Sequence, residues 1–151
     1  MFSIARPAAH AIGVLLAFAA STTQAGEFSV QLRAASDDTM MGLPSCRVDY
    51  TASNGMDAAV RRGSFRVLPL AVEGSTTASV SAASGESLAN IGPVASGAST
   101  ENSFKVRGAP CKNLNGLKLV AFHCVREPDK GNCNANMAVS SAIAALPLII
   151  P

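Results

Sequence analysis

The sequence predicts an all-β protein, a sandwich of about seven short strands with two disulfides. Three observations predict it. Apolar and polar residues alternate in several short segments, which is the pattern of half-buried strands. Turn pairs such as Asn54-Gly55, Glu73-Gly74 and Asn115-Gly116 separate these segments at near-regular spacing, as they do in sandwiches. All four cysteines follow an apolar amino-terminal leader, so an oxidising compartment would pair them.

The leader, residues 1–25, has the layout of a secretory signal. Arg6 is its positive charge, an apolar run covers Ala8–Ala20, and small residues precede a cut after Ala25. Cleavage there leaves 151 − 25 = 126 residues, the length of one domain, which we expect to be a single β-sandwich over 26–151. The apolar run is shorter than the ~20 residues that span a bilayer. We therefore expect a secreted or periplasmic protein, free of the membrane after cleavage.

The expected strands follow one another along the mature chain. In order they are Glu27–Ala34, Cys46–Ala52, Ser64–Val72, Thr76–Ser84, Ser103–Arg107, Leu117–Val125 and a last strand within Met137–Ile150. The side chains expected to point inward from the first two are Phe28, Val30, Leu32, Ala34, Cys46, Val48, Tyr50 and Ala52. Residues 37–44 are expected to form a loop, Ser53–Arg62 tolerates one helical turn, and Pro69 indicates an edge or a bulge. For the apolar tail, a helix face through Val139, Ile143 and Leu146 is the alternative to a strand.

Several of these segments resemble those of a known class. They are Cys46-Arg47-Val48-Asp49-Tyr50 with Asn54, Phe65-Arg66-Val67 with Glu73-Gly74, Asn90-Ile91-Gly92-Pro93, and Ser103-Phe104-Lys105-Val106. Their order resembles the small extracytoplasmic immunoglobulin-like or fibronectin-III-like modules of bacteria, including the secreted family of the interleukin receptor mimic protein A. The resemblance covers roughly Phe28 to Val125, and departs at Gly92-Pro93, where such modules have Pro-Gly. It implies a fold and a binding role, and transfers no catalytic residue.

The four cysteines allow three pairings. Cys124 and Cys133 flank a turn, and a hairpin register with Arg126 opposite Gly131 places the two sulfurs opposite one another. This favours Cys124–Cys133 with Cys46–Cys111. The rival is a bridge between sheets, Cys46–Cys124, with Cys111–Cys133, and the sequence leaves it open.

Few residues suggest chemistry. His123 is the only histidine after the leader, and a small hydrolase using it is one functional alternative. No serine lies in a Gly-x-Ser-x-Gly elbow. A metal site of His123, Cys124 and Cys133 is disfavoured because neighbours on a strand point to opposite faces. Asp37-Asp38 is more typical of a turn than of an acid/base pair. We expect no catalytic residue, metal or cofactor.

Candidate binding residues are basic or methionine. Arg61, Arg62 and Arg66, with Arg47, form a basic patch if the 53–62 segment folds over its neighbour, and otherwise form a solvated strand face. Met40 and Met41 are the other candidates, since the mature chain has no Trp and one Tyr. Its charge is 11 − 10 = +1 once Arg6 is removed, which argues against nucleic acid and anionic membranes as partners.

The favoured function is a non-enzymatic module that binds a host or envelope protein. A homodimer by strand exchange is one form of it, with the apolar tail Ala138–Ile150 as the exchanged strand. The second alternative, beside the hydrolase, is an inhibitor or immunity-type protein that blocks an envelope hydrolase through the loop Asp37–Ser45.

Overall fold

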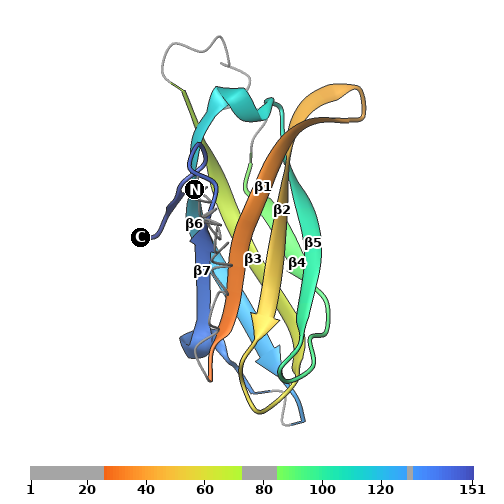
Figure 1. Ribbon diagram of the computed structural model, residues 1–151. Helices are drawn as coiled ribbons and strands as arrows, with labels where there is room; N and C mark the ends of the chain where they lie inside the picture. Colours follow the sequence, from red (N-terminus) through yellow and green to blue (C-terminus); the bar gives the residue numbers. More distant parts are fainter. Residues whose placement is uncertain (1–25, 73–84, 129–130) are drawn as a thin grey trace, which may run out of the picture.

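The structure is a computed structural model that describes residues 26–72, 85–128 and 131–151, and these form two four-stranded sheets facing one another (Figure 1). The expected leader, residues 1–25, and the expected strand Thr76–Ser84 lie outside the described residues. Among those described, no helix is long and apolar enough to cross a bilayer. Because the described residues form two β-sheets, the all-β class is confirmed for this part of the chain.

The first sheet has the strand order β5-β2-β1-β7, and the second has β4-β3-β6-β8. The first sheet consists of β1 (Phe28–Met40), β2 (Leu43–Asn54), β5 (Ser99–Arg107) and β7 (Met137–Ser141). The second consists of β3 (Val60–Ala71), β4 (Ser87–Ile91), β6 (Leu114–Arg126) and β8 (Leu148–Ile149). Two short 3-10 turns, η1 (Cys111–Asn113) and η2 (Asn134–Asn136), precede β6 and β7.

The core lies between the sheets and contains an aromatic cluster. Tyr50, Phe65 and Phe104 come from β2, β3 and β5, and Phe65 meets each of the other two rings edge to face, with centroids 5.4 and 5.5 Å apart. The Tyr50 hydroxyl donates a hydrogen bond of 2.8 Å to the backbone oxygen of Asn90 in β4. Burial raises the pKa of this hydroxyl. The cluster ties the two sheets together, since edge-to-face pairs add to the apolar burial of their rings.

The inward-facing residues of the first two strands were predicted correctly except for Ala34. Phe28, Val30 and Leu32 are fully buried, but the register of β1 against β2 shifts between Leu32 and Ala34. This bulge reverses which side chains face inward, so Ala34 is exposed and Ala35 packs against the core.

The expected loop over residues 37–44 is wrong. These residues continue β1 and β2 as one long antiparallel hairpin, and Asp37 lies opposite Cys46. Only Met41 and Gly42 form the turn, with φ of 53° and 76°. Positive φ at both central residues is the type I′ geometry that matches the twist of a hairpin. Such turns usually have Asn or Asp at the position of Met41, so the Met41-Gly42 pair was not recognised as a turn signal.

Two details of the chain from β2 to β3 bear on the expectations for residues 53–62 and for Pro69. No helical turn forms between β2 and β3. β4 pairs with β3 only over Gly63–Val67, so Pro69 has β6 as its one described neighbour. A register shift lies nearby, between Arg66 and Val67, and Pro69 rather than Leu70 is buried.

The apolar tail forms strands rather than a helix, and it splits between the two sheets. β7 runs parallel to β1, and β8 runs parallel to β6. The described residues therefore form eight strands. Each part of the tail pairs with a strand of its own chain, and exchange of the tail between two copies stays a prediction.

The two disulfides link Cys46 to Cys111 and Cys124 to Cys133. This is the pairing favoured by the sequence, and the rival bridge between Cys46 and Cys124 does not form. The Cys133 N–H donates to the Cys124 carbonyl and the Arg126 N–H donates to the Gly131 carbonyl, both at 3.0 Å. These bonds give the hairpin register that the spacing predicts. Two disulfides also fit an oxidising compartment such as the periplasm or the extracellular space.

Candidate interaction surface

The tip of the β1–β2 hairpin is the most exposed apolar feature among the described residues. The Met41 side chain is 93% exposed and that of Leu43 is 62% exposed. β5 begins to pair with β2 only at Ser45, so the tip extends beyond the neighbouring strand. Figure 1 shows it in orange at one end of the sandwich. Exposed large apolar side chains at a strand turn have no role in the core.

The base of this hairpin is fastened on one side by the first disulfide. Cys46 is joined there to Cys111, which begins η1. The Cys111 N–H donates to the carboxylate of Asp37 at 2.7 Å, and the Gly108 N–H donates to the Pro44 carbonyl at 3.0 Å. Asp37 therefore anchors the η1 segment, and is part of a strand rather than of the turn that the sequence suggested.

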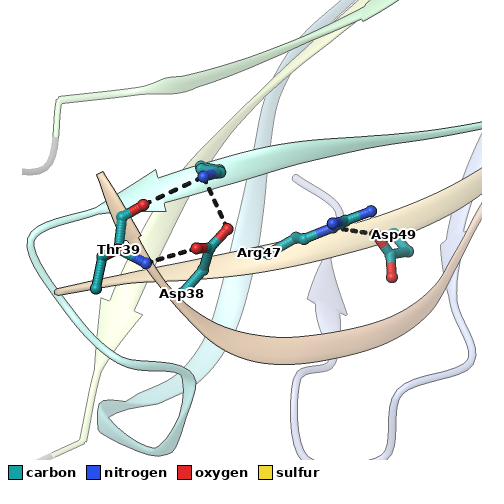
Figure 2. A network of polar contacts seen from close by, with 5 residues as sticks. Asp38, Thr39, Arg47 and Asp49 are labelled. Carbon is teal, nitrogen blue, oxygen red and sulfur yellow. Dashed lines mark hydrogen bonds and ion pairs between the residues drawn. The ribbon is translucent and has the colours of Figure 1, made fainter. Parts of the chain in front are cut away.

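On the other side, Asp38 and Lys105 connect the hairpin to β5 (Figure 2). The Lys105 ammonium lies 2.7 Å from the Asp38 carboxylate and donates to the Thr39 carbonyl at 3.2 Å. The Asp38 carboxylate also accepts the Thr39 N–H at 2.6 Å. The hydrogen bonds from Lys105 and from the Thr39 backbone lower the pKa of Asp38. The hairpin is thus held at its base while its tip stays apolar and exposed.

Met40 links the tip to an open groove between β4 and β5. The groove has a volume of about 730 Å³ and is lined by Met40, Gly85, Glu86, Ser87, Leu88, Asn90, Asn102, Ser103, Phe104, Lys105 and Arg107. Its walls carry both apolar and charged side chains. A groove of this size is in the range of ligand and peptide sites.

The structure separates the arginines that the sequence grouped with one another. Arg47 lies on β2 of the first sheet and pairs with Asp49 at 2.8 Å (Figure 2). Arg61, Arg62 and Arg66 lie on β3 of the second sheet. Arg47 is therefore not part of one patch with them, because the core lies between the two sheets.

Two of the three β3 arginines have acidic partners. Arg66 pairs with Glu86 at 2.6 Å, and Arg61 lies 3.9 Å from Glu127. Exposed pairs of this kind contribute little to stability. Arg61 and Arg62 are next to Val60, the first residue of β3, whereas Met41 is at the opposite end of the sandwich. A role for these arginines in binding stays a prediction, separate from the hairpin tip.

His123 is exposed on β6 and Cys124 is buried in its disulfide. The two side chains thus differ in exposure as expected for neighbours on a strand. Ser64 is opposite His123 across β3 and β6, but the His123 imidazole makes no hydrogen bond to another described residue. Within the described ranges no three His, Cys, Asp or Glu side chains are grouped so as to hold a metal ion.

Leu43 was predicted only as part of the loop Asp37–Ser45, and Lys105 and Arg107 were missed as members of this surface. The signal for Leu43 was the Met-Gly pair before it, which indicates a two-residue turn once a non-standard first residue is allowed. Lys105 and Arg107 lie within the expected strand Ser103–Arg107. Their position depends on which strand pairs with β2, and this comes from the tertiary structure.

Comparison of the chain with protein-family models, with curated proteins and with solved structures found no match in any of the three.

Proposed function

We propose that the protein is an exported, non-enzymatic module that binds another protein through the tip of its β1–β2 hairpin. The observation that carries the proposal is the exposure of Met41 and Leu43 on a hairpin that is fastened at its base. Exposed apolar side chains on a rigid support are typical of binding sites, because little conformational entropy is lost when the partner docks. Methionine suits such a tip, since its flexible thioether adapts to the partner surface.

The immunoglobulin-like or fibronectin-III-like character of the sandwich belongs to the same proposal. Lettering the strands A, B, C and so on in chain order places β1, β2 and β5 as A, B and E in one sheet. It places β3 and β6 as C and F in the other. Immunoglobulin-type sandwiches distribute these five strands in the same way. The fourth and seventh strands differ: β4 lies with β3 and β6, and β7 lies with β1, β2 and β5, the reverse of strands D and G in that fold. The strand order supports a scaffold that presents loops to partners.

Export is supported by the leader sequence and by the two disulfides. The partner would then be a protein of the cell envelope or of a host. The apolar tip favours a partner with an apolar pocket, and the charged pair Asp38–Lys105 at its base would lie at the rim of the interface, where charges contribute to orientation more than to affinity.

The second candidate function is inhibition of an envelope hydrolase through the same tip. The fastened hairpin favours it, because an inhibitor loop must be held in shape before it binds. The positive φ of Met41 and Gly42 makes the tip a tight turn, so it would plug a pocket rather than lie extended along a cleft. Assays of envelope proteases and lysozymes with excess protein test this candidate.

Site-specific photocrosslinking tests the proposal. A photoreactive amino acid replaces Met41 in one variant and Ala135, an exposed residue of η2, in a control. We expect a discrete protein adduct from position 41 that excess unlabelled protein suppresses, and none from position 135. Adducts of equal yield from both positions, or none from position 41, would contradict the proposal.

A further inference from the structure

β5 is an edge strand of the first sheet, and among the described residues its backbone has a neighbouring strand on one side only. It pairs with β2 and with no other described strand. The register is regular over the whole ladder, from Ser45 opposite Arg107 to Ser53 opposite Ser99. Beyond its ends, the Gly108 N–H donates to Pro44 and the Asn54 N–H donates to Ala98. Both bonds join residues of even number, so the ladder bonds of β5 to β2 are made by its even-numbered residues.

The odd-numbered residues of β5 therefore direct their N–H and C=O groups toward the free edge. These residues are Ser99, Glu101, Ser103, Lys105 and Arg107. The Ser103 N–H is the one with a described partner on that side, the side-chain oxygen of its neighbour Asn102 at 2.8 Å. An edge of this length accepts another strand unless its side chains prevent it.

The charges on the edge are complementary to themselves. Lys105 is already paired with Asp38. Glu101 and Arg107 are exposed and have no ion-pair partner among the described residues. They lie on the same face of β5, on either side of Phe104, because side chains two residues apart share a face.

We propose that a second copy of this chain pairs with β5, antiparallel and edge to edge, about a two-fold axis at Phe104. In this register Glu101 is opposite Arg107 of the second copy, and Arg107 is opposite its Glu101. Ser103 is opposite Lys105 of the second copy, and the Lys105–Asp38 pair stays intact. All directly opposed odd-numbered residues exchange backbone hydrogen bonds, and the two first sheets become one continuous sheet.

The neighbouring registers fit less well. An axis at Lys105 would place the two Lys105 side chains opposite one another, and like charges in that position are destabilising. An axis at Ser103 would place Glu101 opposite Lys105, in competition with Asp38, and would leave Arg107 opposite Ser99. Only the register centred on Phe104 pairs both charges that lack a partner. The pairing is isologous, as a closed dimer requires.

This dimer is independent of the hairpin tip. Met41 and Leu43 lie beyond the last pair of β5 with β2, so the tip stays exposed when the edges join. It also differs from strand exchange by the tail, because β7 and β8 remain in their own chain.

Charge reversal tests the inference on the full chain, expressed with its own leader and purified with its disulfides intact. Sedimentation velocity gives the dimer dissociation constant for the wild type, Glu101→Arg, Arg107→Glu and the double variant that carries both. Each single reversal places two like charges at each end of the ladder, and we expect it to weaken the dimer about tenfold or more. The double variant restores opposite charges and should return to within about threefold of the wild type.

Lys118→Glu is the matched control, since Lys118 is exposed on β6 of the second sheet, away from the β5 edge, and its dimer should be unchanged. A wild type that stays monomeric at about 100 µM would overturn the inference. A dimer that tolerates both single reversals would place the interface elsewhere, with exchange of the tail as one possibility. A double variant that remains monomeric would reject the register. None of these results bears on photocrosslinking at position 41, so failure of the two proposals can be told apart.

Discussion

The two ends of the sandwich are built on opposite principles. At the end where β2 meets β3, the buried side chain of Asn54 bonds to three backbone groups, donating to the Ala58 and Val94 carbonyls and accepting the Met56 N–H. This side chain is only 2% exposed and fully satisfied. At the hairpin end, Met41 and Leu43 are exposed and contact no core.

The difference separates stability from availability for binding. A buried polar side chain whose hydrogen bonds are all formed stabilises its end of the fold, because leaving one of these buried groups without a hydrogen bond would be destabilising. An exposed apolar pair contributes nothing to the core of the isolated chain and is accessible to a partner. Each end also has its own disulfide. Cys124, which is joined to Cys133, lies opposite Gly63 near the start of β3, and Cys46–Cys111 lies at the base of the hairpin.

Removal of the disulfides should give the largest effects on stability. The Cys46–Cys111 bridge closes a sequence separation of 65 residues and the Cys124–Cys133 bridge one of 9. Loop-closure entropy predicts that alanine at both Cys46 and Cys111 lowers the free energy of unfolding by about 4 kcal/mol. Alanine at both Cys124 and Cys133 should lower it by about 2.5 kcal/mol. Urea denaturation measures both, and a larger loss from the shorter loop would contradict this ranking.

Asn54→Ala should come next. It leaves the Met56 N–H and the Ala58 and Val94 carbonyls without this partner in a buried place, and we expect a loss of about 2–3 kcal/mol in the free energy of unfolding. Asn102→Ala is the control, because the exposed Asn102 side chain bonds only to the backbone of its neighbour Ser103, and it should change stability by less than about 0.5 kcal/mol. Equal losses in the two variants would mean that the hydrogen bonds of the Asn54 side chain do not stabilise this end of the sandwich.

Asp38 should report on the bracing of the hairpin through its pKa. The hydrogen bonds from Lys105 and the Thr39 backbone hold the folded-state pKa below the ordinary value of 3.8. The stabilisation that this carboxylate contributes is therefore fully present above pH 3.8, and it is lost as the pH falls through the lower pKa of the folded state. NMR titration of the Asp38 carboxyl measures the value. In Lys105→Gln it should move back toward 3.8, and an unchanged value would show that Lys105 does not hold the hairpin.

The sequence predicts the two-sheet β fold and favours the observed disulfide pairing, but it does not predict the surface. Alternation placed Phe28, Val30, Leu32 and the inward residues of β2 correctly, because local period and burial agree there. It failed at Ala34 and along residues 37–44, where a bulge and a turn with Met at positive φ are set by the twist of the hairpin. The ion pair between Asp38 and Lys105 joins residues that are 67 positions apart in the sequence (105 − 38 = 67). No local sequence pattern indicates a contact of this kind.

The most direct test of the account compares two pairs of exposed apolar residues. In one variant Met41 and Leu43 become Asp. In the other Ile149 and Ile150, which are 46% and 61% exposed at the opposite sheet, become Asp. The free energy of unfolding of both variants should be within about 1 kcal/mol of the wild-type value. Each variant is then added as an unlabelled competitor in the photocrosslinking experiment from position 41. The account predicts that the Ile149/Ile150 variant suppresses the adduct as well as wild type does, and that the Met41/Leu43 variant fails at tenfold higher concentration. Equal suppression by the Met41/Leu43 variant would contradict a binding role for the hairpin tip.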